Sequence, residues 1–207
     1  SLFVAFQLRY GLAVYADIAT RLDKPAEASW AETEMDKLDQ AIQEHGWDGE
    51  WFVRKYRADG MVLGSRQNEA GRIYLNSQSW AVISGAATNE QARSAMDAVE
   101  EHLVGDYGIA LFAPPFREAS PLYGGALFNP GQKENAAVFN HTQSWAVMAD
   151  CILGNGARAY AHYRSYMPSR FNAIAEVRQV EPYVHCQGTN SQFSPRQGAG
   201  GLPWLTG

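Results

Sequence analysis

A seven-residue segment occurs twice in this chain, 65 residues apart. The first copy runs from Asn76 to Val82 and the second from His141 to Val147, and the Gln, Ser, Trp, Ala and Val positions are identical in both. Self-similarity at a fixed spacing predicts a repeated supersecondary unit whose neighbouring copies stack and bury a common core. The same step taken from His141 leads to Thr206, where we expect a further unit to begin.

Each unit has the same order of elements: an apolar helix, a turn with glycine, an amphipathic helix and a long irregular return. In the first unit the turn lies near Gly85, and the second helix covers about 88–103 with Thr88 as its N-cap. In the second unit the turn is 154–156, and Pro168 ends the next helix. Inner helix, turn, outer helix and return loop are the parts of a barrel of helical hairpins, so the predicted fold class is all-α.

The first 71 residues predict a further hairpin and a loop. An inner helix over about 2–22 is expected to bury a face with a helical period, made of Leu8, Leu12, Tyr15, Ile18, Ala19 and Leu22. An outer, amphipathic helix follows up to about His45, with Trp30, Met35, Leu38 and Ile42 as its apolar residues, and Gly46 ends it. The aromatic and charged segment 47–71 is expected to form a long functional loop with a hairpin.

The long returns, 107–138 and 168–205, are rich in Gly, Pro, Asn and aromatic residues. Irregular segments of this length are uncommon inside a compact domain unless they build a site. Both lead into the N-terminal ends of inner helices. Because those ends carry free N–H groups and partial positive charge, the mouth of the barrel is suited to an anionic group.

Composition excludes several classes of function. The net charge is -5 and no long basic run is present, so nucleic acid is not an expected partner. The longest apolar stretch is interrupted by Gln7, Arg9 and Asp17, so we expect no membrane partner. Cys151 and Cys186 lack the spacing of a zinc or redox motif, which favours a cytoplasmic location.

The residues with a claim to chemistry lie near the predicted mouth. His141 stands at the start of the second inner helix and could donate a hydrogen bond to an anion, although a capping or buried histidine has the same pattern. Lys133 and Glu134 lie in a loop that would enter the same mouth, or form a solvated surface pair. The alternating segment 181–187 could line a sugar site or form a short edge strand. No metal-binding, nucleophile-elbow or P-loop motif is found.

The motifs above resemble one known family. The segment 133–147, from Lys133 through the second copy of the repeat, is similar to the catalytic domain of cellobiose phosphorylase and its relatives, glycoside hydrolase family 94. The resemblance continues through Glu-Pro-Tyr-Val-His-Cys-Gln at 181–187 and Leu-Pro-Trp-Leu-Thr-Gly at 202–207, and it includes Trp-Asp-Gly-Glu-Trp-Phe at 47–52. It thus spans nearly the whole chain.

The resemblance implies an (α/α)6 barrel in which inorganic phosphate attacks a β-linked glucosyl disaccharide and gives α-glucose 1-phosphate with inversion. It also implies that His141, Thr206 and the amide of Gly207 bind phosphate, that Gln187 contacts the glucosyl ring, and that Lys133 lies toward the acceptor sugar. Phosphate is then a substrate, and no cofactor is expected. A homodimer of the full-length protein is expected from family likeness alone.

The family's general acid, an aspartate, should lie before Ser1, so residues 1–207 are expected to be the C-terminal part of an incomplete barrel domain, truncated at both ends and inactive alone. Glu50, Glu69 and Glu134 are acidic loop residues, and nothing favours one as a substitute. The Cys-Gln-Gly-Thr and Ser-Pro-Arg segments favour cellobiose or cellobionic acid over chitobiose as substrate. The alternatives are an inverting α/α-barrel glycoside hydrolase and a non-catalytic carbohydrate-binding relative.

Overall fold

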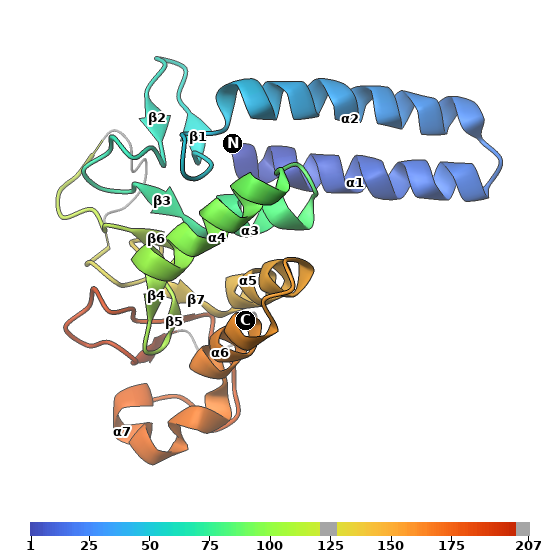
Figure 1. Cartoon of the computed structure of the whole chain (residues 1–207). Coiled ribbons are helices and arrows are strands. Elements are labelled where there is room, and N and C mark those ends of the chain that lie inside the picture. Colours follow the sequence, from blue (N-terminus) through green and yellow to red (C-terminus); the bar gives the residue numbers. More distant parts are fainter. Residues whose placement is uncertain (121–127, 202–207) are drawn as a thin grey trace.

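The computed structural model describes residues 1–120 and 128–201, which form three consecutive helical hairpins with short strands at one end (Figure 1). The hairpins are α1 (Leu2–Arg21) with α2 (Pro25–His45), α3 (Leu75–Ile83) with α4 (Asn89–Leu103), and α5 (Asn140–Ile152) with α6 (Gly156–Tyr166). The predicted repeat of inner and outer helices is therefore present in the structure.

The inner helices pack in a row. Helix α3 contacts both α1 and α5, and each outer helix packs against its own inner helix. A row of adjacent inner helices is the arrangement that a ring of helical hairpins requires. The described residues show three adjacent hairpins in this arrangement.

Local signals in the sequence account for the turns of the second and third hairpins. Thr88 and Gln91 form a capping box, because the Thr88 hydroxyl accepts from the Gln91 N–H at 3.2 Å and the Gln91 side chain accepts from the Thr88 N–H at 3.0 Å. Gly85 and Gly154 have φ values of +73° and +76°, a conformation that favours glycine. Both predicted turns are confirmed.

The predicted buried face of α1 is only partly correct. Leu12 and Ala19 are buried, together with Phe6 and Ala16, but the other predicted residues, Leu8, Tyr15, Ile18 and Leu22, are exposed in the described structure. The reason is that α2 packs closely on small side chains, where Ala16 and Leu12 meet Ala31. Trp30 on α2 is likewise 54% exposed and contacts Tyr15 at its edge.

Helix α1 is also the one described helix that is long and apolar enough, by length and composition alone, to cross a membrane. Core helices of soluble proteins meet the same criterion. Here Arg9, in the middle of α1, pairs with Asp39 on α2 at 2.6 Å and donates to the Ser84 carbonyl after α3. These polar contacts show that one side of α1 packs against protein.

The seven α-helices in the described part of the chain agree with the predicted helical fold class, and the return segments add short strands to it. The strands are β1 (Lys55–Tyr56), β2 (Val62–Leu63), β3 (Ile73–Tyr74), β4 (Val104–Gly105), β5 (Gly108–Ile109), β6 (Phe112–Ala113), β7 (Val138–Phe139), β8 (Gly188–Thr189) and β9 (Gly200–Gly201). They pair antiparallel as β1–β2, β3–β6, β4–β5 and β7–β8–β9. The β1–β2 pair is the predicted hairpin. Strands of two residues are too short to leave a period in the sequence.

The last return also contains helical turns. A 3-10 helix over Pro168–Ile174 is followed by α7 (Ala175–Arg178). The alternating segment 181–187 is not an edge strand, because the strand begins only at Gly188. This return was predicted to be irregular throughout, and the prediction was wrong for its first part, Pro168 to Arg178.

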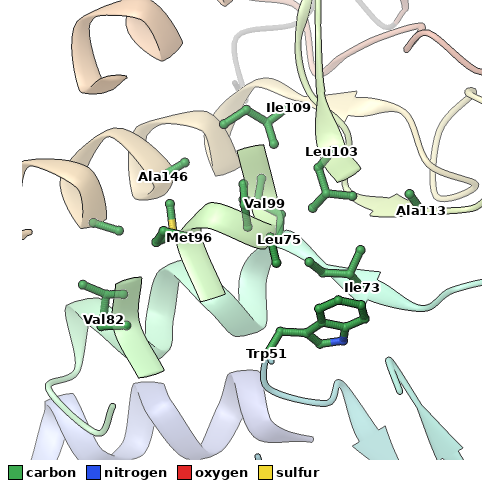
Figure 2. Packing of buried hydrophobic residues seen from close by; sticks show 13 residues of the cluster. Trp51, Ile73, Leu75, Val82, Met96, Val99, Leu103, Ile109, Ala113 and Ala146 are labelled. Atoms are coloured by element: carbon green, nitrogen blue, oxygen red, sulfur yellow. The ribbon is translucent and has the colours of Figure 1, made fainter. Parts of the chain in front are cut away.

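The main hydrophobic core lies between α3, α4 and the middle of α5, where Ala146 and Ala149 belong to it (Figure 2). Leu75, Met96 and Val99 are fully buried there, and Ile109 reaches it from the strands. Trp51 closes the core from the 47–71 segment, and its indole N–H donates to the carbonyls of Gly64 and Arg72 at 2.9 and 3.0 Å. The aromatic part of this predicted functional loop is therefore a core anchor.

Candidate functional site

The three inner helices begin in the same way. In each, the N–H of the first residue donates to a backbone carbonyl of a return segment: Leu2 to Arg54 at 3.0 Å, Leu75 to Leu111 at 3.0 Å, and Asn140 to Gln187 at 3.1 Å. Because the first N–H groups of a helix have no acceptor within it, these bonds attach the returns to the helix starts. The return segments and their short strands gather at this end of the hairpins (Figure 1). The sequence predicted this position for the returns but not the strands.

The repeated glutamine strengthens this attachment. Gln78 accepts from the N–H of Phe52 and donates to its carbonyl, both at 2.9 Å. Gln143 makes the same pair with Ile109, at 2.8 and 3.0 Å. Each amide also donates to the carbonyl four residues before it, at 3.0 Å. The most similar part of the two units therefore attaches return segments to the inner helices, which is a structural role.

His141 is the second residue of α5, and its side chain is exposed. Its ring lies 5.5 Å from Trp145 and 5.7 Å from Phe139, with both rings nearly perpendicular to it. Partial burial lowers the pKa of His141 below its ordinary value. At neutral pH the imidazole is neutral, and one ring N–H is then a hydrogen-bond donor beside the first turn of a helix.

Aromatic rings continue from this histidine across the inner helices. Trp145 lies edge-on to its repeat counterpart Trp80, with ring centroids 5.6 Å apart. Phe3 of α1 contacts both, at 5.6 Å from Trp145 and 6.0 Å from Trp80. Trp145 thus contacts the His141 ring as well as aromatic rings on the neighbouring helices α1 and α3.

Gln187 lies beside the start of α5. Its carbonyl accepts from the Asn140 N–H, and the strand that follows it pairs with β7, with Phe139 opposite Gly188. Gln187 and His141 are 46 positions apart in sequence, yet the structure brings their backbones to the same helix start. The first part of the same segment has different surroundings, because Glu181, Pro182 and Tyr183 line a separate cavity of about 240 Å³.

Lys133 precedes β7 in a tight turn, with φ of 45°. Its side chain is exposed and its ammonium group lies 5.1 Å above the ring of Phe128. Buried Asn135 holds this turn through hydrogen bonds with the backbone of Phe116 and Phe128, at 2.6 to 2.9 Å. The turn is well anchored, and Lys133 stands on its exposed side.

Thr206 and Gly207 lie outside the described residues. The strand before them, β9, is paired with β8, with Gly201 opposite Gly188. Since neighbouring strands lie about 4.8 Å apart, the chain at Gly201 is roughly 10 Å from Phe139 and the start of α5. The chain therefore approaches residues 202–207 from the same edge that carries His141.

The role of Asn140 was not predicted from the sequence. Its side chain is 2% exposed and its amide nitrogen donates to the Cys186 carbonyl. The repeat could have indicated this role, because the residue 65 positions before Asn140 is Leu75, which belongs to the core. A buried amide where the first unit has leucine marks a departure from the common scaffold.

His162 and His185 have surroundings that differ from those of His141. His162 lies between Glu100, 2.8 Å from its Nε2, and Asp150, 3.0 Å from its Nδ1. Burial opposes protonation of His162, but the two carboxylates outweigh it and raise its pKa. Burial, followed by the charge of Arg178, lowers the pKa of His185. His162 is thus part of a structural charge network between α4, α5 and α6.

Within residues 1–120 and 128–201, no group of three or more His, Cys, Asp or Glu side chains is arranged to hold a metal ion. Of the acidic loop residues, Glu50 lies 3.9 Å from Arg66, and Glu69 lines a cavity of about 580 Å³ with Arg117 and Glu118. Glu134 is exposed. The geometry favours none of the three as a general acid.

Comparison with known proteins adds a family match. A family model described as the glycosyl hydrolase 94 superfamily, catalytic domain, matches residues 1–207. The chain is 35% identical to an N,N'-diacetylchitobiose phosphorylase of Vibrio proteolyticus over 100% of its own length and 26% of that protein. It is 33% identical to a solabiose phosphorylase of Paenibacillus borealis, over 83% of the chain and 22% of that protein.

A cellobionic acid phosphorylase of Neurospora crassa is 38% identical over 64% of the chain and 17% of that protein. The chain therefore spans about a quarter, or less, of the length of these curated relatives. The names of these three relatives give different substrates, although their sequence identities to this chain are similar.

Proposed function

Since this chain belongs to the glycosyl hydrolase 94 superfamily, as the match over residues 1–207 shows, we propose that it is part of an inverting disaccharide phosphorylase. The similar proteins named above are phosphorylases, which supports this reaction class. The structural observation that carries the proposal is the position of His141, whose side chain stands at the first turn of α5 beside the strands that lead to Gln187 and to residues 202–207.

Phosphate would bind at this helix start. The N–H groups of the first turn of a helix have no acceptor within the helix, and the helix dipole favours an anion there. His141 would donate one hydrogen bond from its neutral ring, and Thr206 and the amide of Gly207 would supply others. The lowered pKa of His141 supports a donor role without a fixed positive charge.

In the proposed reaction, a phosphate oxygen attacks the anomeric carbon of the glucosyl unit from the face opposite the glycosidic oxygen. The new carbon–oxygen bond forms as the glycosidic bond breaks, and the leaving sugar oxygen takes a proton from a general acid. Phosphate thus replaces the activated water of an inverting hydrolase. The products are α-glucose 1-phosphate and the released sugar. The acid would be an aspartate that lies outside residues 1–207.

The proposed substrate is a β-linked glucosyl disaccharide of the cellobiose or cellobionic acid class. The Cys-Gln-Gly-Thr and Ser-Pro-Arg segments support this choice, and Gln187 would contact the glucosyl ring. Lys133 would lie toward the acceptor sugar, where its exposed ammonium could meet hydroxyl or carboxylate groups.

The proposal extends to the whole protein. The row of inner helices supports closure into an (α/α)6 barrel, of which the three hairpins would be part. A cytoplasmic location and a homodimer are proposed from composition and from family likeness, respectively. No cofactor is proposed, because phosphate itself is a substrate.

One assay separates this function from an inverting hydrolase and from a non-catalytic carbohydrate-binding relative. The full-length protein would be incubated with cellobiose or cellobionic acid, with and without inorganic phosphate, and its products identified. We expect cleavage that depends on phosphate and yields a sugar 1-phosphate. Cleavage without phosphate would indicate the hydrolase, and binding without cleavage the carbohydrate-binding relative.

A further inference from the structure

The start of α5 differs from the start of α3 at the first residue of the helix, which is buried in both. Leu75, the first residue of α3, is fully buried in the hydrophobic core, whereas its counterpart Asn140 is 2% exposed. Burying an amide in place of leucine is unfavourable unless the amide is hydrogen-bonded. Packing alone therefore does not account for the asparagine.

Asn140 joins the helix start to the segment that carries Gln187. Its backbone N–H donates to the carbonyl of Gln187 at 3.1 Å, and its side-chain nitrogen donates to the carbonyl of Cys186. The same nitrogen lies 3.5 Å from the sulfur of Cys186, which is fully buried and lies 3.1 Å from the Gly188 carbonyl. Asn140 thus donates to the carbonyls of two consecutive residues, Cys186 and Gln187, in the return segment beside it.

These two bonds determine how two proposed site residues lie relative to each other. His141 follows Asn140 directly, and Gln187 follows Cys186 directly. We propose that Asn140 is a positioning residue that holds the phosphate bound at His141 in line with the glucosyl unit bound at Gln187. This inference rests on the proposed phosphorolysis, and Asn140 touches neither substrate.

Alignment matters because phosphate must approach the anomeric carbon along the line of the breaking bond. A misplacement of about 1 Å in such a pair costs roughly 10²-fold in rate. A displaced phosphate also leaves the anomeric carbon open to water. In that case the glycosidic bond breaks, water supplies the new oxygen, and free sugar forms in place of sugar 1-phosphate.

The test is Asn140→Leu in the full-length protein, which copies the residue of the first unit. We expect kcat/KM for phosphate to fall by about 10²-fold and the KM values for phosphate and disaccharide both to rise. We also expect the ratio of free sugar to sugar 1-phosphate to increase. Loss of folded protein lowers both products equally and leaves this ratio and both KM values unchanged, so the ratio distinguishes positioning from stability.

Asn140→Asp provides a second test, because the aspartate side chain has nearly the same shape as that of asparagine. An ionised carboxylate cannot donate to the Cys186 carbonyl, whereas a protonated one can. We expect the product ratio of this variant to approach that of the unmodified protein at low pH and that of Asn140→Leu at high pH. Gln78→Leu is the matched control, because it removes a buried amide of the first unit and should leave the product ratio unchanged.

The outcomes are distinct. If the unmodified protein cleaves disaccharide without phosphate, the proposed function fails. If the unmodified protein depends on phosphate but both Asn140 variants keep its product ratio and KM values, the positioning role alone is overturned.

Discussion

The first and second repeat units have the same scaffold but carry different polar groups. Gln78 and Gln143 make equivalent bonds to a return segment, and Trp80 and Trp145 contact each other. At the helix starts, Leu75 and Asn76 of the first unit correspond to Asn140 and His141 of the second. In this protein, identity between the repeats therefore marks what holds the hairpins together, and differences mark the candidate site.

The units also differ in the length of their inner helices. Helix α3 ends at Ile83, whereas α5 continues to Ile152 and includes Asp150, which corresponds to the turn residue Gly85. Asp150 is fully buried, 2.7 Å from Arg158 and 3.0 Å from His162. In the second unit, Asp150 thus joins the inner helix α5 to the outer helix α6 through ion pairs. In the first unit, the corresponding residue is Gly85, which has no side chain to form such pairs.

The largest expected effect comes from breaking this charge network. Asp150→Asn would leave Arg158 and His162 without their buried partner, and the free energy of unfolding should fall by about 3–5 kcal/mol. Denaturant unfolding would measure the loss. Asp97→Asn is the control, because Asp97 pairs with the same arginine but its side chain is 69% exposed, so its loss should cost about 0–1 kcal/mol. Similar losses in both variants would contradict the central role of Asp150.

The second prediction tests whether the glutamines are equivalent. Gln78→Leu and Gln143→Leu each leave a buried backbone N–H and carbonyl unpaired, so each should lower the free energy of unfolding by about 2–3 kcal/mol. The same denaturant experiment applies to both. A large loss in one variant and a negligible loss in the other would show that the repeat is not symmetric in its scaffold.

The third prediction tests the difference between the helix starts. His141→Ala in the full-length protein should raise the KM for phosphate by about 10- to 100-fold, because a hydrogen bond to an ionised group contributes about 1.5–3 kcal/mol. Initial rates over a range of phosphate concentrations would measure this. Asn76→Ala, the counterpart in the first unit, should leave this KM unchanged. An unaltered phosphate requirement in the His141 variant would remove this residue from the site.

The smallest expected effect is a pH dependence that arises at His162, between Asp150 of the second unit and Glu100 of the first. The pKa of His162 is raised in the folded protein, so its charged form contributes stability that is fully present below its unfolded pKa of about 6.5. This contribution is lost as the pH rises through the raised pKa. Melting temperatures at about pH 6 and about pH 8.5 should therefore differ less in His162→Gln than in the unmodified protein. An identical difference in the two proteins would exclude His162 as its source.

Much of the helical framework could be predicted from local signals. The N-cap at Thr88, the glycine turns and the proline at 168 each act on backbone groups within a few residues, so each gives its helix a readable end. The apolar period of α1 was also readable, but it does not show which of several apolar stripes meets α2. Side-chain size decided that, because alanines on both helices allow a close approach.

The candidate site was only partly predictable. His141 and Gln187 were found through the repeat and the family resemblance, whereas Asn140 was passed over as a neighbour. Its role depends on Cys186, 46 residues away, and neither residue shows in the sequence which backbone group it will meet. The strands at the mouth were missed for a related reason, since two-residue ladders are formed by distant pairing and leave no local pattern.

The sequence by itself determined the repeated hairpins and their ends, because hydrophobic period, caps and turn residues act over a few neighbouring positions. It also determined the family, through motifs that extend along the chain. Only the tertiary structure decided which face of α1 is buried, which loop residues become core and which amide holds the two sides of the mouth together. These outcomes depend on hydrogen bonds and packing between residues far apart in the chain, and no local signal encodes them.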